Sequence, residues 1–460
     1  MGRKRQPNQL VLVFPEGGRG EAPKAPERAE PPVAAPADER PATAERRMER
    51  VVETQNAREA LRRVQANRGA PGVDGMTVRQ LAGYLRKQWP TIREQLLSGT
   101  YRPQPVKRVE IPKPGGGVRV LGIPTVLDRF IQQAILQVLQ PEWDATFSDH
   151  SFGFRPGRSA HQAVAQAQAY LGEGCQWVVD IDLEQFFDRV NHDRLMGRVA
   201  KRVADKRLLK LIRAFLNAGM MVGGVVIPRG QGTPQGGPLS PLLSNLLLDD
   251  LDRELECRGH RFVRYADDCN IYVRSERAGE RVMASVTRFL ERKLKLKVNA
   301  EKSAVAQPQQ RKFLGFSFTR EPQPRRKLAR QTVERFKREV RRRARASRGR
   351  SLEQIVCDLT DYLRGWRAYY GFCQTRSELK GLDEWIRRRL RCLAWRHWKH
   401  GPKRYAELRK RGVAPDWAAT TAGSPRGPWH LSHCPALTRA FPNAYFAHLG
   451  LVSLAAPIRA

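Results

Sequence analysis

Short apolar runs typical of strands lie in the middle of the chain, together with longer stretches of helical period. The most informative run surrounds the pair Asp267-Asp268. Apolar residues flank this pair on both sides with no helical period: before it Phe262, Val263 and Tyr265, and after it Ile271, Tyr272 and Val273. The pattern predicts a hairpin of two short strands with both carboxylates at its turn.

A second predicted hairpin carries basic side chains. Alternation through 106–111 and 118–121, on either side of a turn at 114–117, is typical of paired strands. The interleaved basic residues are Lys107, Arg108, Lys113 and Arg119. A basic face of this kind could hold phosphates, and an ordinary solvated face is the alternative.

Further elements follow from the same pattern. Strands are predicted at 177–181, 295–298 and 313–318. Helices are predicted within 43–68, 78–85, 128–139, 160–170, 241–256, 279–294, 332–348, 352–370 and 385–398. The last three helices are amphipathic, with apolar residues inward and arginines outward.

The charge balance indicates a polyanionic partner. The 460 residues suffice for two or three domains, and they contain 83 Lys and Arg against 46 Asp and Glu, a net charge of +37. Self-repulsion of this size costs stability unless a polyanion neutralises it, so nucleic acid is the first candidate and an anionic membrane surface the second. No apolar run approaches the roughly 18 residues that span a bilayer, and no secretory signal follows Met1.

The seven cysteines are scattered and show no Cys-x-x-Cys spacing, which favours reduced thiols in a reducing, bacterial-type cytoplasm or nucleoid. His430, His433 and Cys434 lie close together in the sequence. Their spacing fits no standard zinc pattern, so we expect no metal there.

Composition divides the chain into four parts. Residues 1–45 are rich in Pro, Ala, Arg and Glu and are expected to be a disordered extension. Residues 46–320 hold the predicted strands. Residues 321–410 contain 27 basic and 10 acidic residues, which predicts a helical nucleic-acid clamp. Residues 411–460 are rich in Gly, Pro, Trp and His and form a small C-terminal part.

Three carboxylates are candidates for chemistry. Asp267 and Asp268 repel each other at a turn, which is costly unless a cation neutralises them. Asp182 leaves a short apolar strand and is followed by Phe186 and Phe187, an arrangement that suits a metal ligand beside a sugar. A plain surface turn and an Asp-capped helix start are the alternatives.

The order of these blocks resembles that of reverse transcriptases, and most closely the group II intron reverse transcriptase and maturase family. The matching blocks are Gly72-Val73-Asp74-Gly75, Arg155-Pro156-Gly157-Arg158-Ser159, Phe186-Phe187-Asp188, Pro234-Gln235-Gly236, Tyr265-Ala266-Asp267-Asp268 and Phe313-Leu314-Gly315-Phe316. The sequence 365–370 is similar to the start of the maturase segment. The resemblance covers residues from about 46 to the C-terminus.

The resemblance implies an α+β fold of the right-hand polymerase type: fingers and a palm with an antiparallel sheet in 46–320, a helical thumb or maturase domain in 321–410, and a small DNA-binding region in 411–460. It implies an RNA-directed DNA polymerase that uses two Mg²⁺ ions, held by Asp182, Asp267 and Asp268. Its partners would be intron RNA, an RNA template–primer duplex, target DNA and deoxynucleoside triphosphates, with no membrane.

The resemblance also assigns residues to the nucleotide and to nucleic acid. Phe187, or alternatively Phe186, would exclude a 2′-hydroxyl. The other expected nucleotide contacts are Lys107, Lys113, Arg119, Gln235 and Gly236. The expected nucleic-acid contacts are Arg155, Arg158, Arg341, Arg342, Arg343, Arg387, Arg388 and Arg391.

Fuller members of the family carry a Cys and His endonuclease domain after the maturase segment. The sequence lacks the necessary Cys pairs, so we expect a type without that domain, which would assist splicing and copy its intron by target-primed reverse transcription. Two alternatives are a splicing-only RNA-binding maturase and a domesticated reverse transcriptase in DNA repair or defence.

Overall fold

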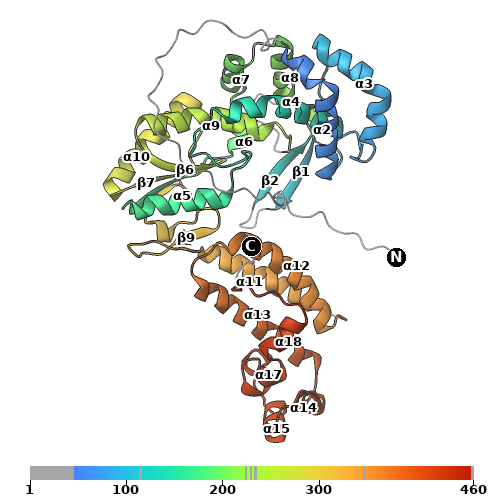
Figure 1. Cartoon of the computed structure of the whole chain (residues 1–460), viewed down its shortest axis with the longest axis vertical. Helices are drawn as coiled ribbons and strands as arrows, with labels where there is room; N and C mark the ends of the chain where they lie inside the picture. Colours follow the sequence, from blue (N-terminus) through green and yellow to red (C-terminus); the bar gives the residue numbers. More distant parts are fainter. Residues whose placement is uncertain are drawn as a thin grey trace, which may run out of the picture. The chain divides into compact units, whose positions relative to one another are not determined.

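The computed structural model describes residues 46–112, 117–222, 225–227, 231–232, 236–345 and 349–456. The extension expected at 1–45 lies outside the described residues, as do Lys113 and Gln235. Residues from Ala42 onward form one compact unit. Strands and helices both contribute to it (Figure 1), which confirms the α+β class.

The N-terminal helices of this unit are α1 (Arg47–Val51), α2 (Thr54–Ala66) and α3 (Leu81–Ser98), and α1 and α2 pack on α4 (Val126–Asp144). One helix was expected across 43–68, but it is broken before Thr54, where the Asn56 side chain donates to the Val51 carbonyl. Helix α3 runs well beyond the predicted end at 85. Its buried stripe continues through Ile92 and Leu96 despite Pro90, and it ends before Gly99, which has φ +69°.

The basic hairpin forms as predicted. Strands β1 (Val106–Pro112) and β2 (Val118–Ile123) pair antiparallel, with Lys107 opposite Ile123 and Ile111 opposite Arg119. Side chains alternate between faces along a strand, so Lys107 and Arg119 share one face. The sequence did not predict β4 (Met220–Val222) and β5 (Val225–Ile227), which complete this sheet in the order β2-β1-β4-β5.

The second sheet has the order β6-β7-β3-β8 and is antiparallel throughout. Its strands are β3 (Trp177–Ile181), β6 (Arg261–Tyr265), β7 (Asp268–Val273) and β8 (Ala304–Ala306). The strand predicted at 295–298 is wrong: a π-helical turn, Leu290–Leu294, is followed by Lys295 with φ +57°, and Val298 makes only an isolated bridge with Leu183.

The two faces of this sheet belong to two different hydrophobic cores, because successive side chains of a strand point to opposite faces. Val179 and Ile271 lie in one core with α9 (Ser240–Cys257) and α10 (Glu276–Phe289), while Val178 and Tyr272 lie in the other with α5 (Ala160–Gly172). The remaining helices before the sheet's hairpin are α6 (Phe186–Arg189), α7 (His192–Arg202) and α8 (Lys206–Asn217). The sheet is therefore covered on both faces, and its strand ends are left to carry polar groups.

The C-terminal third is helical. Its main helices are α11 (Arg330–Arg345), α12 (Leu352–Tyr370) and α13 (Arg376–His397), which follow the ribbon of β9 (Phe316–Phe318) and β10 (Arg326–Leu328). The smaller helices are α14 (Gly401–Lys410), α15 (Pro415–Ala422), α16 (Pro428–Leu431), α17 (Pro435–Ala440) and α18 (Asn443–His448). One core extends from Phe152 to Leu454, so the helices share it with α5.

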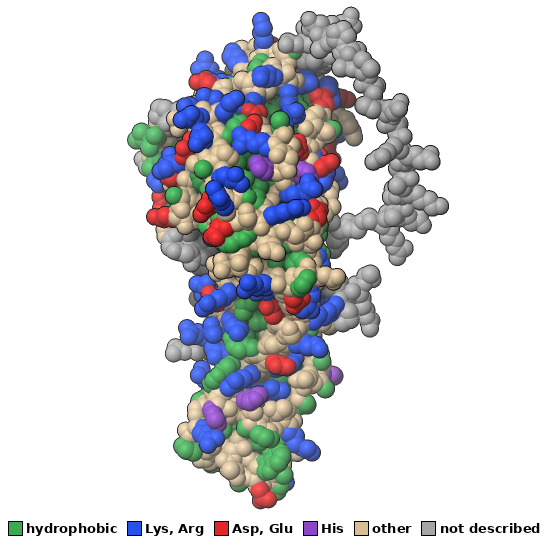
Figure 2. Space-filling view, turned by 90° about the vertical axis from the view of Figure 1, so that its left-hand side faces the viewer, with side chains coloured by type: hydrophobic (Ala, Val, Ile, Leu, Met, Phe, Trp, Pro, Cys, Tyr) green, Lys and Arg blue, Asp and Glu red, His purple; other side chains and the backbone are tan. Residues whose placement is uncertain are grey.

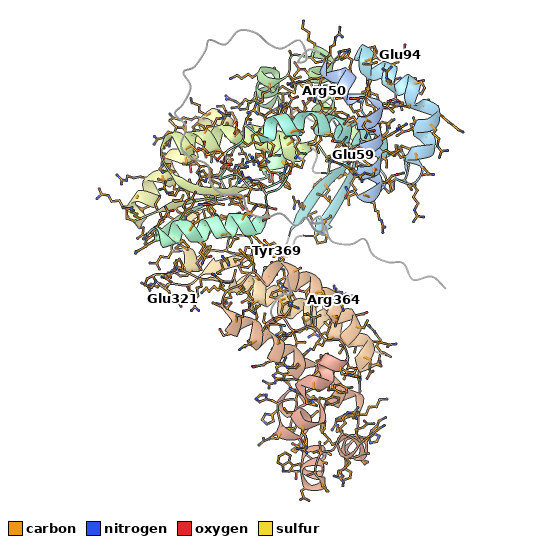
Figure 3. The ribbon with its side chains drawn as sticks, viewed as in Figure 1. Arg50, Glu59, Glu94, Glu321, Arg364 and Tyr369 are labelled. Atoms are coloured by element: carbon orange, nitrogen blue, oxygen red, sulfur yellow. The ribbon has the colours of Figure 1, made fainter. Side chains whose placement is uncertain are left out.

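Tyr369 (labelled in Figure 3) is a junction between α12 and the rest of this core. Its carbonyl lies 2.7 Å from His161 Nε2 on α5, and its hydroxyl donates to the Leu314 carbonyl at 2.9 Å. Lys and Arg side chains are numerous over the face shown in Figure 2. Within the described ranges, no helix is both long enough and apolar enough to cross a membrane.

Candidate active site

Asp182, Asp267 and Asp268 lie at one edge of the β6-β7-β3-β8 sheet. Asp182 directly follows β3, Asp267 lies in the turn between β6 and β7, and Asp268 begins β7. Ile181 pairs with Cys269, so the next residue toward this edge on each strand is a carboxylate, Asp182 on β3 and Asp268 on β7. The register of two strands therefore brings together residues that are 86 positions apart in the sequence.

The turn that carries the pair is tight. Tyr265 pairs with Asp268, so only Ala266 and Asp267 connect the two strands. Ala266 has φ +58°, in the left-handed region that non-glycine residues seldom adopt. Gly153 packs against this turn so closely that a Cβ there would lie 2.2 Å from the Ala266 nitrogen. The turn is thus held by a neighbouring loop as well as by its own strands.

The electrostatics of the three carboxylates reflect their proximity. Loss of hydration, followed by the charge of Asp182, raises the pKa of Asp267. Loss of hydration, followed by the charges of Asp267, Asp180 and Asp182, raises the pKa of Asp268 to about 7. Like charges disfavour the ionised state, so a bound cation would relieve a repulsion that the fold itself creates.

We predict that the loss of hydration at Asp268, together with this repulsion, makes the metal-free protein less stable at high pH. The pKa of Asp268 is about 7 in the folded protein against an ordinary 3.8. The folded state therefore keeps a proton that the unfolded state has lost, and stability falls as pH rises between these two values. Asp268 is exposed, so solvent reduces the effect. The measurement is Tm against pH from 4 to 8.5 for the wild type and Asp268→Asn.

We expect Asp268→Asn to have the higher Tm at pH 8 without metal, and a smaller fall between pH 4 and pH 8. Adding Mg²⁺ at pH 8 should raise the Tm of the wild type more than that of the variant. Identical pH profiles for the two proteins would show that the carboxylates do not repel each other in the folded state.

The donor set suits a hard divalent cation, because carboxylate oxygens are the ligands that such ions prefer. The carboxylates are not yet arranged as a closed cage: the described residues contain no group of three or more Asp, Glu, His or Cys placed to hold a metal ion. Lys302 Nζ instead lies 3.6 Å from Asp182 Oδ1. Lys302 is 66% exposed, so its flexible side chain is able to give way to a cation.

Four residues that the sequence interpretation left unassigned support this edge. The backbone amide of Asn299 donates to the backbone carbonyl of Asp182 at 2.8 Å. The Ser303 hydroxyl accepts from the backbone amide of Asp182 at 2.9 Å. Arg311 donates to Asp180 Oδ2 from Nε and Nη2, at 2.9 and 2.6 Å. The only sequence signal was the spacing of Asp180 and Asp182, which places both on one face of β3.

The structure describes most of the residues that are expected to contact the nucleotide. Lys107 and Arg119 share an exposed face of the hairpin, and the charge of Arg119 offsets part of the rise in the pKa of Asp267. Gly236 has φ +151°, and a Cβ there would lie 2.7 Å from the Gly122 carbonyl oxygen, so Gly236 lies against β2. Phe186 is 3% exposed within the core, whereas Phe187 is half-buried. The geometry favours Phe187 over its alternative.

Two of the expected nucleic-acid arginines are corrected by the structure. Arg155 is buried, and it donates to Asp144 Oδ1 at 2.8 Å and to the Ser151 carbonyl at 3.0 Å. Arg391 is also buried, and it donates twice to the Phe441 carbonyl. Their guanidinium groups satisfy backbone and carboxylate acceptors inside the protein, so they stabilise the fold and do not face a ligand.

The other six expected arginines are at least partly accessible. Arg341 and Arg342 are exposed on α11, and Arg158, Arg343, Arg387 and Arg388 are intermediate. Several also have partners within the protein: Arg158 with Asp149, Arg342 and Arg343 with Glu339, and Arg341 and Arg388 over the Trp385 and Trp429 rings. Their role in nucleic-acid binding stays a prediction.

Known proteins share both halves of this architecture. Residues 111–318 match the family described as reverse transcriptase (RNA-dependent DNA polymerase), and residues 333–412 match the group II intron, maturase-specific domain. Protein YkfC of Escherichia coli K12 is 34% identical over 288 residues, covering 54% of this chain and 75% of YkfC. The chain belongs to the group II intron reverse transcriptase and maturase family.

Two further proteins are similar to parts of the chain. The group II intron-encoded protein LtrA of Lactococcus lactis is 37% identical over 195 residues, covering 42% of this chain and 32% of LtrA. The chain therefore spans about a third of the length of LtrA. Among solved structures, a partial Cas6-RT-Cas1–Cas2 complex is 26% identical with a TM-score of 0.35, covering 53% of this chain and 42% of that chain.

As a reverse transcriptase and maturase, the chain has the right-hand polymerase fold and the RNA-directed DNA polymerase activity of its family. The sheet with the three carboxylates lies within the matched reverse transcriptase region, and α12 and α13 lie within the matched maturase region. Nucleic acids and intron RNA are the substrates that these two domains imply, and divalent metal ions are the family's usual cofactors.

Proposed function

We propose that this protein copies an RNA template into DNA at the edge of the β6-β7-β3-β8 sheet, and that it also binds its own intron RNA and assists its splicing. The observation that supports this most strongly is the register of β3 with β7 and of β6 with β7, which gathers Asp182, Asp267 and Asp268 at one edge of the sheet. Carboxylates brought together at a cost are typical of a catalytic centre.

Asp182 and Asp267 would hold two Mg²⁺ ions, and Asp268 would complete the ligand set. Bound ions of this kind favour attack of the primer 3′-oxygen on the α-phosphorus and neutralise the charge of the departing pyrophosphate. The protein would keep its carboxylates aligned through the strand register and through Asn299 and Ser303, which fix the backbone of Asp182. Fixed groups of this kind cost no rearrangement during the reaction.

Lys107 and Arg119 would bind the triphosphate, together with Lys113, which lies between them in the sequence. The guanidinium of Arg119 suits bidentate contacts to phosphate oxygens. The exposed arginines of α11 would contact the phosphates of an A-form template–primer duplex, which is recognised by shape and backbone. During mobility the same activity would extend a target-DNA end or nascent strand along the intron RNA.

Primer extension and splicing assays on the purified protein test this function. We expect Mg²⁺-dependent extension of a DNA primer on an RNA template, and faster splicing of the transcript that flanks the gene when the protein is added. Splicing without extension would favour a splicing-only maturase. Extension without any effect on splicing would favour a domesticated reverse transcriptase.

The half-buried ring of Phe187 leads to a prediction on sugar selectivity. We expect Phe187→Val to relax discrimination against ribonucleotides by roughly 10-fold or more, because the ring would fill the space of a 2′-hydroxyl. The measurement is kcat/KM for a deoxynucleotide relative to the matching ribonucleotide, with Phe187→Tyr as the control of similar size. Unchanged selectivity in Phe187→Val would remove this role, and the buried Phe186 would need to be reconsidered.

The exposed arginines of α11 lead to a prediction on salt dependence. Replacing Arg341, Arg342 and Arg345 by Gln should weaken template–primer binding and reduce the slope of log Kd against log salt by about 2 units, since each lost phosphate contact removes roughly 0.7 to 0.9. The control replaces Arg277, Arg281 and Arg288, which are exposed on α10, and loses the same charge. Equal slopes for both triple variants would rule out a specific clamp role for α11.

A further inference from the structure

A completely buried ion pair lies directly behind the turn that carries Asp267 and Asp268. The side chains of Arg264 on β6 and Asp252 on α9 are both 0% exposed. Arg264 Nε and Nη2 donate to the two oxygens of Asp252 at 2.7 and 2.5 Å, a bidentate geometry. Arg264 is only three residues before Asp267 in the sequence, but its side chain is enclosed in the protein.

The Arg264 guanidinium also reaches the turn itself. Its Nη1 donates to the Ala266 carbonyl at 2.9 Å and to Asn245 Oδ1 at 2.9 Å. The Asn245 amide group in turn donates to the Gly153 carbonyl at 2.9 Å, and Gly153 is the residue packed against Ala266. The backbone of Arg264 pairs with the same loop, donating to the His150 carbonyl and accepting from the Phe152 amide.

These contacts tie three separate segments together: the turn, helix α9 and the loop 148–155. An ion pair buried for stability alone has little advantage, because well-packed apolar residues of similar volume stabilise a core equally well or better. What apolar residues could not do is hold the Ala266 carbonyl. Ala266 has a left-handed backbone (φ +58°), a strained conformation for a non-glycine residue, so the turn would relax unless it is held.

We propose that Arg264, Asp252 and Asn245 are positioning residues, which fix the Ala266-Asp267 turn so that its carboxylates stay beside Asp182, where together they would hold a divalent cation. This inference rests on the proposed function of the three carboxylates. None of the three positioning residues touches a substrate: they act through the Ala266 carbonyl and the Gly153 loop.

The decisive test replaces the ion pair by apolar residues, Arg264→Met together with Asp252→Leu. We expect the metal-free Tm of this double variant to stay close to that of the wild type, because no buried charge is left unpaired. Hydrogen exchange of a peptide containing residues 265–268 should be faster, the Mg²⁺-dependent rise in Tm should be reduced, and kcat should fall about 100-fold. The Kd for template–primer and the KM for nucleotide should change little.

The control is Glu254→Leu with Arg258→Met, which removes an ion pair from the end of the same helix. It should alter none of these readouts. A double variant at Arg264 and Asp252 that keeps the wild-type exchange rate, metal response and kcat would overturn the inference, since the pair would then be replaceable packing.

Asn245→Leu provides a second test if the double variant does not fold. It leaves the ion pair intact and removes only the link to Asn245 and Gly153. We expect faster exchange at 265–268 and a weaker Mg²⁺ response in a folded protein, and an unchanged turn would contradict the inference. Failure of the proposed function has a different signature: the wild type itself would then extend no primer, while exchange at the turn would still report on these residues.

Discussion

We expect replacement of Asp267 by Asn to lower the rate of nucleotide incorporation by at least about 10³-fold, equivalent to about 4 kcal/mol of transition-state stabilisation. The reason is its place at the edge of the sheet: Asp267 lies in the turn before β7, and its charge interacts with those of both Asp182 and Asp268. Removing its charge would remove a proposed metal ligand without removing a core contact. The measurement is single-turnover extension of a primer annealed to RNA.

Binding and stability distinguish this effect from misfolding. Template–primer affinity should be unchanged, and the metal-free Tm of Asp267→Asn should equal or exceed that of the wild type, because one repelling charge is gone. Asp361→Asn is the matched control, since this carboxylate on α12 is 78% exposed and far along the chain from the sheet. Wild-type incorporation by Asp267→Asn would contradict the assignment of the site.

We expect replacement of Gly153 by Ala to lower incorporation by about 100-fold, although Gly153 carries no functional group. A Cβ at this position would lie 2.2 Å from the Ala266 nitrogen and 2.9 Å from the Tyr265 carbonyl carbon. Both contacts are with backbone, so no side chain can rotate away, and the turn with Asp267 has to shift. The effect is therefore expected in kcat, with template–primer binding preserved.

Gly172→Ala provides the matched control. Gly172 ends helix α5, and nothing lies within 4 Å of a Cβ built there. We expect this variant to be as active as the wild type and slightly more stable, by up to about 1 kcal/mol, because alanine favours a helix. If Gly153→Ala were equally active, the turn would be tolerant of displacement, and the packing of loop 148–155 against it would have no catalytic role.

The hydrophobic pattern predicted the elements on which the site depends. The hairpin around Asp267-Asp268, the strand that ends before Asp182 and the helices at 160–170 and 352–370 were all expected and are confirmed. These segments bury one clear face or lie entirely in the core, so their pattern is strong. The pairing of β3 with β7 could not be read from either segment alone, because it joins residues far apart in the sequence.

The elements that were missed or misplaced depend on tertiary contacts. Strands β4, β5 and β8 have only three residues each, too few for alternation to be distinctive. Helix α3 continues through Pro90 because Ile92 and Leu96 are buried against the core. Burial of a charged side chain is equally invisible to composition, which is why Arg155 and Arg391 were expected at a surface that they do not reach.

The same limit applies to the support behind the site. Arg264 was visible as the residue before Tyr265, but its partners Asp252 and Asn245 lie on a helix whose pattern showed only an apolar stripe. Polar residues on an amphipathic helix are usually solvated. Asp252 and Asn245 are instead buried and hydrogen-bonded. The family resemblance identified the carboxylates, whereas only the fold shows what holds them.

The most direct test of the central claim is the incorporation of a single deoxynucleotide by the wild-type protein. The reaction uses a DNA primer annealed to RNA, with and without Mg²⁺, beside the variant Asp182→Asn with Asp267→Asn. We expect metal-dependent incorporation by the wild type and none above background by the variant, at equal template–primer occupancy. Incorporation by both proteins, or by neither despite full binding, would contradict a polymerase site at this edge of the sheet.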